Sequence, residues 1–215
     1  MKTTRLLLLV TVTALASACS NIEHSRNLAN PKVSGITIAQ QVCSLCHGAD
    51  GNAISPNFPS LAGQQPAYLT AQMQEFRGHN RLDPAGFEYM WGLSRSLTDD
   101  QIAGLADFFS AQKIAAPAQG ISDVVSLTAG RIIYETGVPN KNVPACASCH
   151  GDMAQGNGIF PQLVHQHADY TVKQLMVFQR TDERPLGSIM KTVVHDLTKK
   201  NMEDVAAYLQ VFSTH

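Results

Sequence analysis

The sequence predicts an all-α protein built from two tandem, related domains. Three observations predict this architecture. A short motif of two cysteines and a histidine occurs twice, about a hundred residues apart, and the segments around it repeat at a similar offset. Apolar residues recur at helical spacing, and no segment shows the sustained alternation of a half-buried strand. A chain of 215 residues has room for two small domains.

Composition excludes some classes of protein. The chain has 16 Lys and Arg residues against 17 Asp and Glu residues, a formal net charge of −1. Because phosphate binding needs a basic surplus on one face, this balance argues against nucleic acid as a partner. A hydrophobic fraction of 44% is enough to build a core and excludes a wholly disordered chain.

Residues 1–18 are predicted to be a secretory signal peptide of the lipoprotein type. Lys2 and Arg5 precede a leucine-rich run that is too short to span a bilayer, and small residues follow. The segment Leu15-Ala-Ser-Ala-Cys19 resembles a bacterial lipoprotein box, in which the chain is cut before the cysteine and the cysteine is acylated. An ordinary cut that leaves Cys19 as a free thiol is the alternative, although a spare thiol is a liability in an oxidising compartment.

The signal peptide predicts a periplasmic protein attached to the membrane through acylated Cys19. Ser20 after the cysteine favours the outer membrane. Residues 19–34 are polar and are predicted to form a tether between the lipid anchor and the first domain.

The internal repeat predicts the domain boundaries. Two motifs return with small changes of offset that fall in expected loops: Cys43-Ser-Leu-Cys46-His47-Gly48 as Cys146-Ala-Ser-Cys149-His150-Gly151, and Phe58-Pro-Ser-Leu61 as Phe160-Pro-Gln-Leu163. The first domain is predicted at 35–114, the linker with its proline and glycine at 115–126, and the second domain at 127–215. Domains this small often need a covalent link or a bound metal to be stably folded.

Each half is predicted to be helical. An apolar stripe follows Pro66, a residue that suits a first helical turn: Leu69, Met73 and Phe76. A second helix begins at Thr98 with a Thr-x-x-Gln capping pattern, and its apolar stripe is repeated after Thr198. Shorter helices are predicted before the cysteine pairs, near 35–42 and 128–135.

The repeated motif C-x-x-C-H is the signature of covalent haem c attachment. In each copy two thiols add to the vinyl groups of the porphyrin, and the next histidine becomes the proximal iron ligand: Cys43, Cys46 and His47 in the first, Cys146, Cys149 and His150 in the second. A zinc site would need the cysteine pairs close together, and a thioredoxin-like redox pair would need a β-α-β context. A disulfide across two intervening residues at a helix start has poor geometry.

The repeat also predicts the second ligand of each iron. Of the seven methionines, only Met90 and Met190 occupy equivalent places in the two halves, each in an expected loop before the last helix. Among the remaining histidines, His195 is the best rival for the second iron, because it follows Met190 by five residues. A thioether ligand raises the reduction potential and fills the position that a substrate would need, which favours electron transfer.

The chain resembles the dihaem cytochromes c4, within the class I cytochromes c. The resemblance covers nearly all of the mature chain and rests on five segments: Cys43–Asn52, Asn57–Gln64, Met90-Trp-Gly, Phe160–Leu163 and Ile189-Met190. It implies two tandem class I cytochrome c domains related by pseudo-twofold symmetry, with two covalently bound haem c groups that face each other across the domain interface. It also implies that Pro59 and Pro161 offer their carbonyls to the proximal histidines.

The resemblance implies an electron carrier rather than an enzyme. Members of the family carry electrons in the periplasm, commonly from a quinol–cytochrome c oxidoreductase to a terminal oxidase or reductase. Two other functions remain open from the residues alone: a haem enzyme with an open iron, and a redox subunit of a larger oxidoreductase complex. The segment Val164–His167 departs from its first-half counterpart, so the surroundings of the two haems differ.

Overall fold

The computed structural model describes residues 26–117 and 123–212. The predicted signal peptide, the predicted acylation site Cys19 and the middle of the predicted linker therefore lie outside the described residues. Within the described ranges the chain is helical, with two isolated β-bridges and no named strand, which confirms the all-α class. No helix in these ranges is long and apolar enough to cross a membrane.

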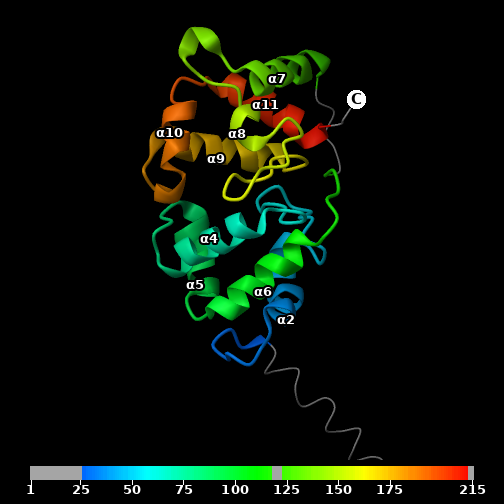
Figure 1. Cartoon of the computed structure of the whole chain (residues 1–215), viewed down its shortest axis with the longest axis vertical. Helices are drawn as coiled ribbons and strands as arrows, with labels where there is room; N and C mark the ends of the chain where they lie inside the picture. Colours follow the sequence, from blue (N-terminus) through cyan, green and yellow to red (C-terminus); the bar gives the residue numbers. More distant parts are fainter. Residues whose placement is uncertain (1–25, 118–122, 213–215) are drawn as a thin grey trace, which may run out of the picture.

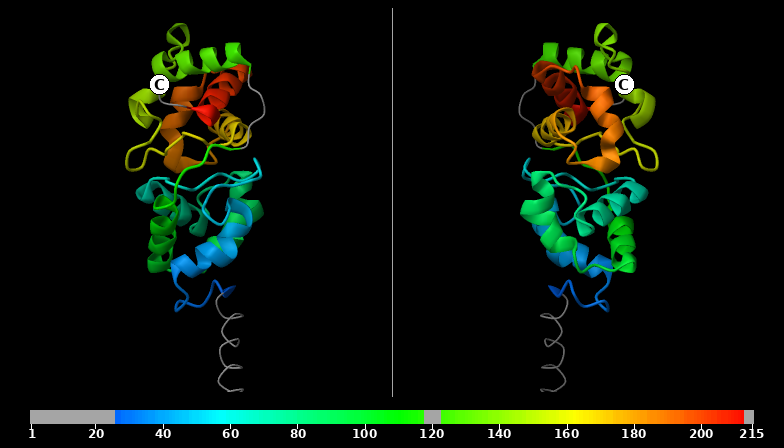
Figure 2. Two further views of the ribbon diagram at one scale, coloured as in Figure 1. Left: turned by 90° about the vertical axis from the view of Figure 1, so that its right-hand side faces the viewer. Right: turned by 90° about the vertical axis from the view of Figure 1, so that its left-hand side faces the viewer.

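The described helices fall into two bodies stacked end to end, with loops of both halves meeting between them (Figures 1 and 2). The first body contains seven helical segments in chain order: α2 (Gly35–Ile38), η2 (Ala39–Cys43), α3 (Ser44–His47), α4 (Pro66–Arg77), η3 (Gly86–Met90), α5 (Trp91–Ser94) and α6 (Asp99–Ser110). The second has a similar series, in which η4 and η5 are 3-10 turns rather than π turns: α7 (Val124–Thr136), η4 (Pro139–Lys141), α8 (Ala147–His150), α9 (Ala168–Arg180), η5 (Pro185–Gly187), α10 (Ser188–Val194) and α11 (Lys199–Val211).

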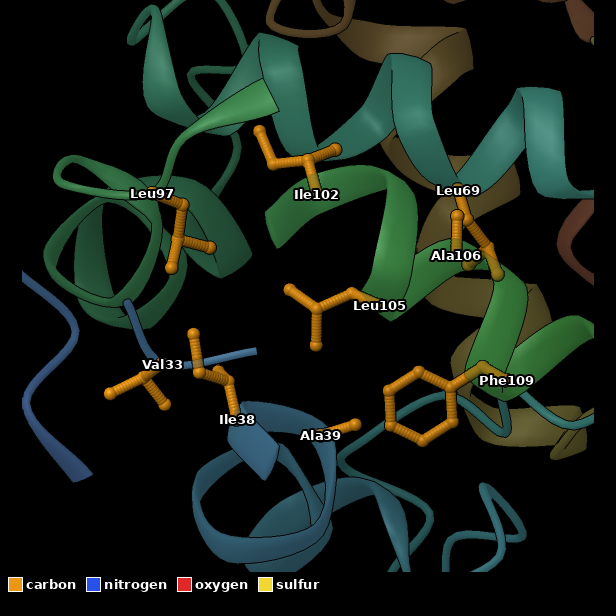
Figure 3. Close-up of a cluster of buried hydrophobic side chains, with 9 residues drawn as sticks. All are labelled: Val33, Ile38, Ala39, Leu69, Leu97, Ile102, Leu105, Ala106 and Phe109. Atoms are coloured by element: carbon orange, nitrogen blue, oxygen red, sulfur yellow. The ribbon is translucent and has the colours of Figure 1, made fainter. Parts of the chain in front are cut away.

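Each body has its own hydrophobic core. In the first, α6 packs against α2 and α4 because its apolar stripe is buried between them (Figure 3). The core side chains are Val33, Ile38, Ala39, Leu69, Leu97, Ile102, Leu105, Ala106 and Phe109. In the second, α11 packs against α7 and α9 around an equivalent cluster that includes Tyr134, Val194, Met202 and Leu209.

The last helix of each body begins where the capping pattern predicts. The Thr98 hydroxyl accepts a hydrogen bond from the Gln101 backbone N–H, and the Gln101 side chain accepts from the Thr98 N–H. Thr198 and Asn201 form the same reciprocal pair at the start of α11. These caps satisfy backbone donors that the first helical turn leaves without an intrahelical acceptor.

Three boundaries differ from the sequence-based expectation. The predicted tether ends in packed structure, because Val33 lies in the first core and its carbonyl accepts from the Gln101 side chain. Helix α7 begins at Val124, capped by Asp123, so the last residues of the predicted linker are helical. The helix that starts at Gly35 continues as a π turn and an α turn through the first cysteine motif.

The interface between the two bodies is polar and nearly symmetric. Arg81 lies over the Phe76 ring, and its counterpart Arg184 lies over Phe178, each at about 4.5 Å from guanidinium carbon to ring centroid. Both guanidinium groups donate to the same two glutamine side chains, Gln72 and Gln174. The symmetry is broken at Asp83, a fully buried carboxylate that pairs with Arg81 alone among the described residues.

Candidate cofactor sites

The first cysteine motif lies on one continuous helical stretch. Cys43 ends η2 and Cys46 lies one turn later in α3, so the two thiols share a face of the helix. His47 ends the helix, and Gly48 then turns the chain with φ 84°. A Cβ at this position would lie 2.2 Å from the Asn52 carbonyl oxygen, so only glycine permits the turn.

The imidazole of His47 is buried and held in one orientation. Its Nδ1 lies 2.9 Å from the Pro59 carbonyl oxygen, which requires Nδ1 to carry the proton and leaves the Nε2 lone pair for a metal. Phe58 packs edge-on against the ring at 6.2 Å between centroids. Burial lowers the pKa of His47 despite the opposing effect of the Pro59 carbonyl, which favours the neutral form of the ring.

The second motif builds the same geometry independently. Cys146 caps α8, His150 ends it, and Gly151 has φ 82°. His150 Nδ1 lies 2.8 Å from the Pro161 carbonyl oxygen, and Phe160 packs edge-on against the ring at 6.3 Å. Burial again lowers the pKa of the histidine. Both proline carbonyls therefore contact the histidines that the family resemblance assigns to them.

The cysteine thiols suit covalent attachment better than metal ligation. All four cysteines of the two motifs are free. Burial raises the pKa of Cys43 to about 12 and that of Cys146 to about 11, so these thiols stay protonated near neutral pH. No cluster of three or more potential metal-binding side chains from His, Cys, Asp and Glu occurs in the described ranges, unlike in a zinc site.

The two candidate methionine ligands lie at equivalent places in short helices. Met90 ends the π turn η3, and Met190 lies in α10, where it packs against the second core. Both side chains are partly buried. The expectation that they lie in loops was wrong, because the chain before the last helix forms helical turns in both halves. Three other methionines pack in or against the cores: Met73, Met176 and Met202.

The residues that join the two bodies were not among the predicted functional residues. Arg81 and Arg184 match across the repeat, but the changing loop length around them hides the match. Gln72 and Gln174 match at the same offset as the other residues of α4 and α9. That match was the one sequence signal that pointed to the interface. The contacts of the polar interface could therefore be identified only from the tertiary structure.

Comparison with known proteins identifies the family. The cytochrome c family model matches residues 33–113 and 128–212. The chain is 34% identical to cytochrome c4 of Stutzerimonas stutzeri, and the match covers 95% of each chain.

The chain belongs to the cytochrome c4 family.

The chain also matches a solved cytochrome c4 structure and a relative with a different name. The solved structure of Acidithiobacillus ferrooxidans cytochrome c4 matches with a TM-score of 0.72 and 38% identity, over 78% of this chain and 96% of that one. The chain is also 31% identical to a thiosulfate dehydrogenase electron acceptor of Thiomonas intermedia, over 78% of this chain and 76% of that protein.

As a cytochrome c4, the protein carries two covalently bound haem c groups, one in each domain, and is an electron-transfer protein rather than an enzyme. The two domain matches also establish the tandem cytochrome c architecture. When bound, each haem supplies a one-electron Fe(III)/Fe(II) couple. The neutral, buried histidines with a free Nε2 and the protonated thiols beside them fit such a group.

Proposed function

We propose that His47 and Met90 ligate the iron of the first haem, and that His150 and Met190 ligate the iron of the second. The cysteine pairs Cys43 with Cys46 and Cys146 with Cys149 attach the porphyrins. With both axial positions filled by side chains, such a site gains and loses electrons with little rearrangement. The thioether ligand favours Fe(II) and so raises the reduction potential.

The observation that carries this proposal is that the rival imidazoles of the second half are engaged elsewhere. On the half-exposed side chain of His195, Nδ1 bonds the Thr192 carbonyl and Nε2 lies 3.2 Å from Asp196. His167 is buried against the Ala53 carbonyl of the first domain, and His165 bonds the Gln210 carbonyl. Met190 is left as the candidate for the sixth position in the second domain.

We expect Met190→Ala to leave the sixth coordination position of the second iron without a protein ligand. The altered protein, matured with both haems, gains one carbon-monoxide-binding, high-spin haem per chain, while the unaltered protein shows two low-spin haems and no carbon monoxide response. Optical spectra of the oxidised and reduced proteins, with haem counted per chain, measure this. Met153→Ala is the matched control, because Met153 is exposed and has no counterpart in the first half. Carbon monoxide binding by the unaltered protein would contradict methionine ligation.

We further propose that the protein carries electrons in the periplasm from a quinol–cytochrome c oxidoreductase to a terminal oxidase or reductase. A second electron donor, thiosulfate dehydrogenase, is favoured by one observation, that a relative is named as its electron acceptor. The two candidate donors are distinguished by mixing the oxidised protein with each purified enzyme and its substrate, quinol or thiosulfate. The donor is the enzyme that reduces both haems at the higher second-order rate, and reduction by neither would contradict both assignments.

The proposed membrane attachment through acylated Cys19 rests on the lipoprotein box. Cells grown with a tagged fatty acid are expected to label the unaltered protein and not Cys19→Ser. The mass of the mature protein should correspond to a chain that begins at an acylated Cys19. An unlabelled mature chain would show instead that an ordinary signal peptidase cuts here and that the protein is free in the periplasm.

A further inference from the structure

Two glutamine side chains clamp the backbone of the opposite domain. The Gln166 side-chain oxygen accepts from the Ser60 backbone N–H at 2.9 Å, and its nitrogen donates to the Ser60 carbonyl at 2.9 Å. In the same way, Gln64 accepts from the Gln162 backbone N–H at 2.8 Å and donates to the Gln162 carbonyl at 3.0 Å. The two clamps are related by the sequence repeat, since both glutamines and both clamped residues match at an offset of 102.

Each clamp reaches the peptide group that holds a proximal histidine. The Ser60 N–H and the Pro59 carbonyl belong to one planar amide. That carbonyl accepts from His47, while the N–H of the same amide donates to Gln166 of the second domain. The reciprocal amide, between Pro161 and Gln162, accepts from His150 and donates to Gln64 of the first domain. The two hydrogen-bonded chains therefore cross the interface in opposite directions.

The orientation of both clamps is fixed by their surroundings. The Gln64 and Gln166 side-chain oxygens each accept a second hydrogen bond, from the backbone N–H of the next residue. Their nitrogens face carbonyl oxygens, so exchanging the two ends of either amide would break all of these bonds. The residues are only 5% and 8% exposed, and hydrogen bonds in such a setting polarise one another more strongly than in water.

We infer that Gln166 tunes the reduction potential of the first haem and that Gln64 tunes that of the second, each from the opposite domain. The inference rests on the proposed ligation by His47 and His150. An acceptor on the amide N–H makes the carbonyl of that amide more negative and a stronger acceptor from the histidine Nδ1–H. The imidazole then gives more electron density to the iron and stabilises Fe(III). These glutamines are thus positioning residues that act through a peptide group.

The test is a pair of substitutions in the full protein carrying both haems, Gln166→Leu and Gln64→Leu. Losing Gln166 should raise the reduced-to-oxidised ratio of the first haem about threefold at a fixed applied potential. This threefold change corresponds to a rise of about 28 mV in reduction potential, because a tenfold change in the ratio corresponds to 59 mV for a one-electron couple. Losing Gln64 should do the same to the second haem. Spectroelectrochemical titration measures both potentials.

Gln65→Leu is the matched control. Gln65 also donates across the interface, to the Gln155 carbonyl at 2.8 Å, but it does not touch a proline amide. This variant should leave both potentials in place. If a leucine variant loses haem, Gln166→Asn and Gln64→Asn keep the polar group but are one methylene too short to reach the amide.

Two more measurements assign the effect to one haem. Met90→His and Met190→His each lower the reduction potential of one haem, because histidine replaces the axial methionine. Each variant therefore shows which of the two transitions in the titration belongs to which haem. In the reduced, diamagnetic protein, Gln166→Leu should move the Nδ1–H proton resonance of His47 upfield and leave that of His150 unchanged.

The pattern of shifts decides between the possibilities. A shift confined to the haem of the opposite domain supports the crossed arrangement. The crossed arrangement would be overturned by equal shifts in the potentials of both haems or by a shift confined to the haem of the substituted domain. It would also be overturned by potential shifts in Gln65→Leu, or by unchanged potentials in a leucine variant that retains both haems. Failure of the proposed ligation would appear earlier, as an unaltered protein whose spectrum is not that of two low-spin haems with methionine ligands.

Discussion

Replacing Cys146 and Cys149 together with alanine is expected to reduce the haem content from two covalently bound groups per chain to one. Without the two thiols the second porphyrin cannot be attached, and His150 alone does not retain it through denaturation. The first domain should keep its haem, because each domain has its own hydrophobic core. Intact mass of the purified chain and the haem-to-protein ratio measure the change directly.

The double variant also tests the role of haem in stability. Cys146 packs against the second core, so loss of the haem should lower the unfolding temperature of the second domain more than that of the first. Cys43→Ala with Cys46→Ala is the mirror-image control and should remove the other haem. A chain that still carries two haems after either change would refute the attachment assigned to these motifs.

Replacing Gly130 with alanine is expected to destabilise the second domain by about 3 kcal/mol, although the same exchange stabilises most helices. Gly130 lies in α7 where this helix crosses α11. An added Cβ would lie 2.0 Å from the Asp204 backbone oxygen and 2.8 Å from the Tyr208 Cβ, so the two helices would have to move apart. Gly35 plays the same part at the crossing of α2 and α6.

Urea unfolding of the protein with both haems, followed by circular dichroism, measures the free energy lost by Gly130→Ala. Thr128→Ala is the control in the same helix, because Thr128 is exposed and its hydroxyl donates to the Val124 carbonyl of α7 itself. The control should leave stability unchanged or raise it by up to about 1 kcal/mol. Equal stability of the two variants would show that the helix crossing tolerates a wider separation than the structure indicates.

The sequence was sufficient for the fold class and for the presence of two covalently bound haem c groups. Helix periodicity and the capping threonines depend on residues close together in the chain, so α4, α6 and α11 begin near their predicted positions. The C-x-x-C-H spacing is also local, and the duplication showed which methionines match. The individual site assignments remain predictions, both the cysteines as attachment points and the histidines and methionines as iron ligands.

The tertiary structure decided what depends on contacts between distant residues. Val33 could not be separated from a tether by composition, because its place in the core comes from packing against α6. The rival histidines could be set aside only when their hydrogen-bond acceptors were known. The clamps of Gln64 and Gln166 join residues about a hundred positions apart, and no local pattern records such a bond. Local spacing specifies helices and covalent attachment, whereas the surroundings of each haem depend on how the two domains pack together.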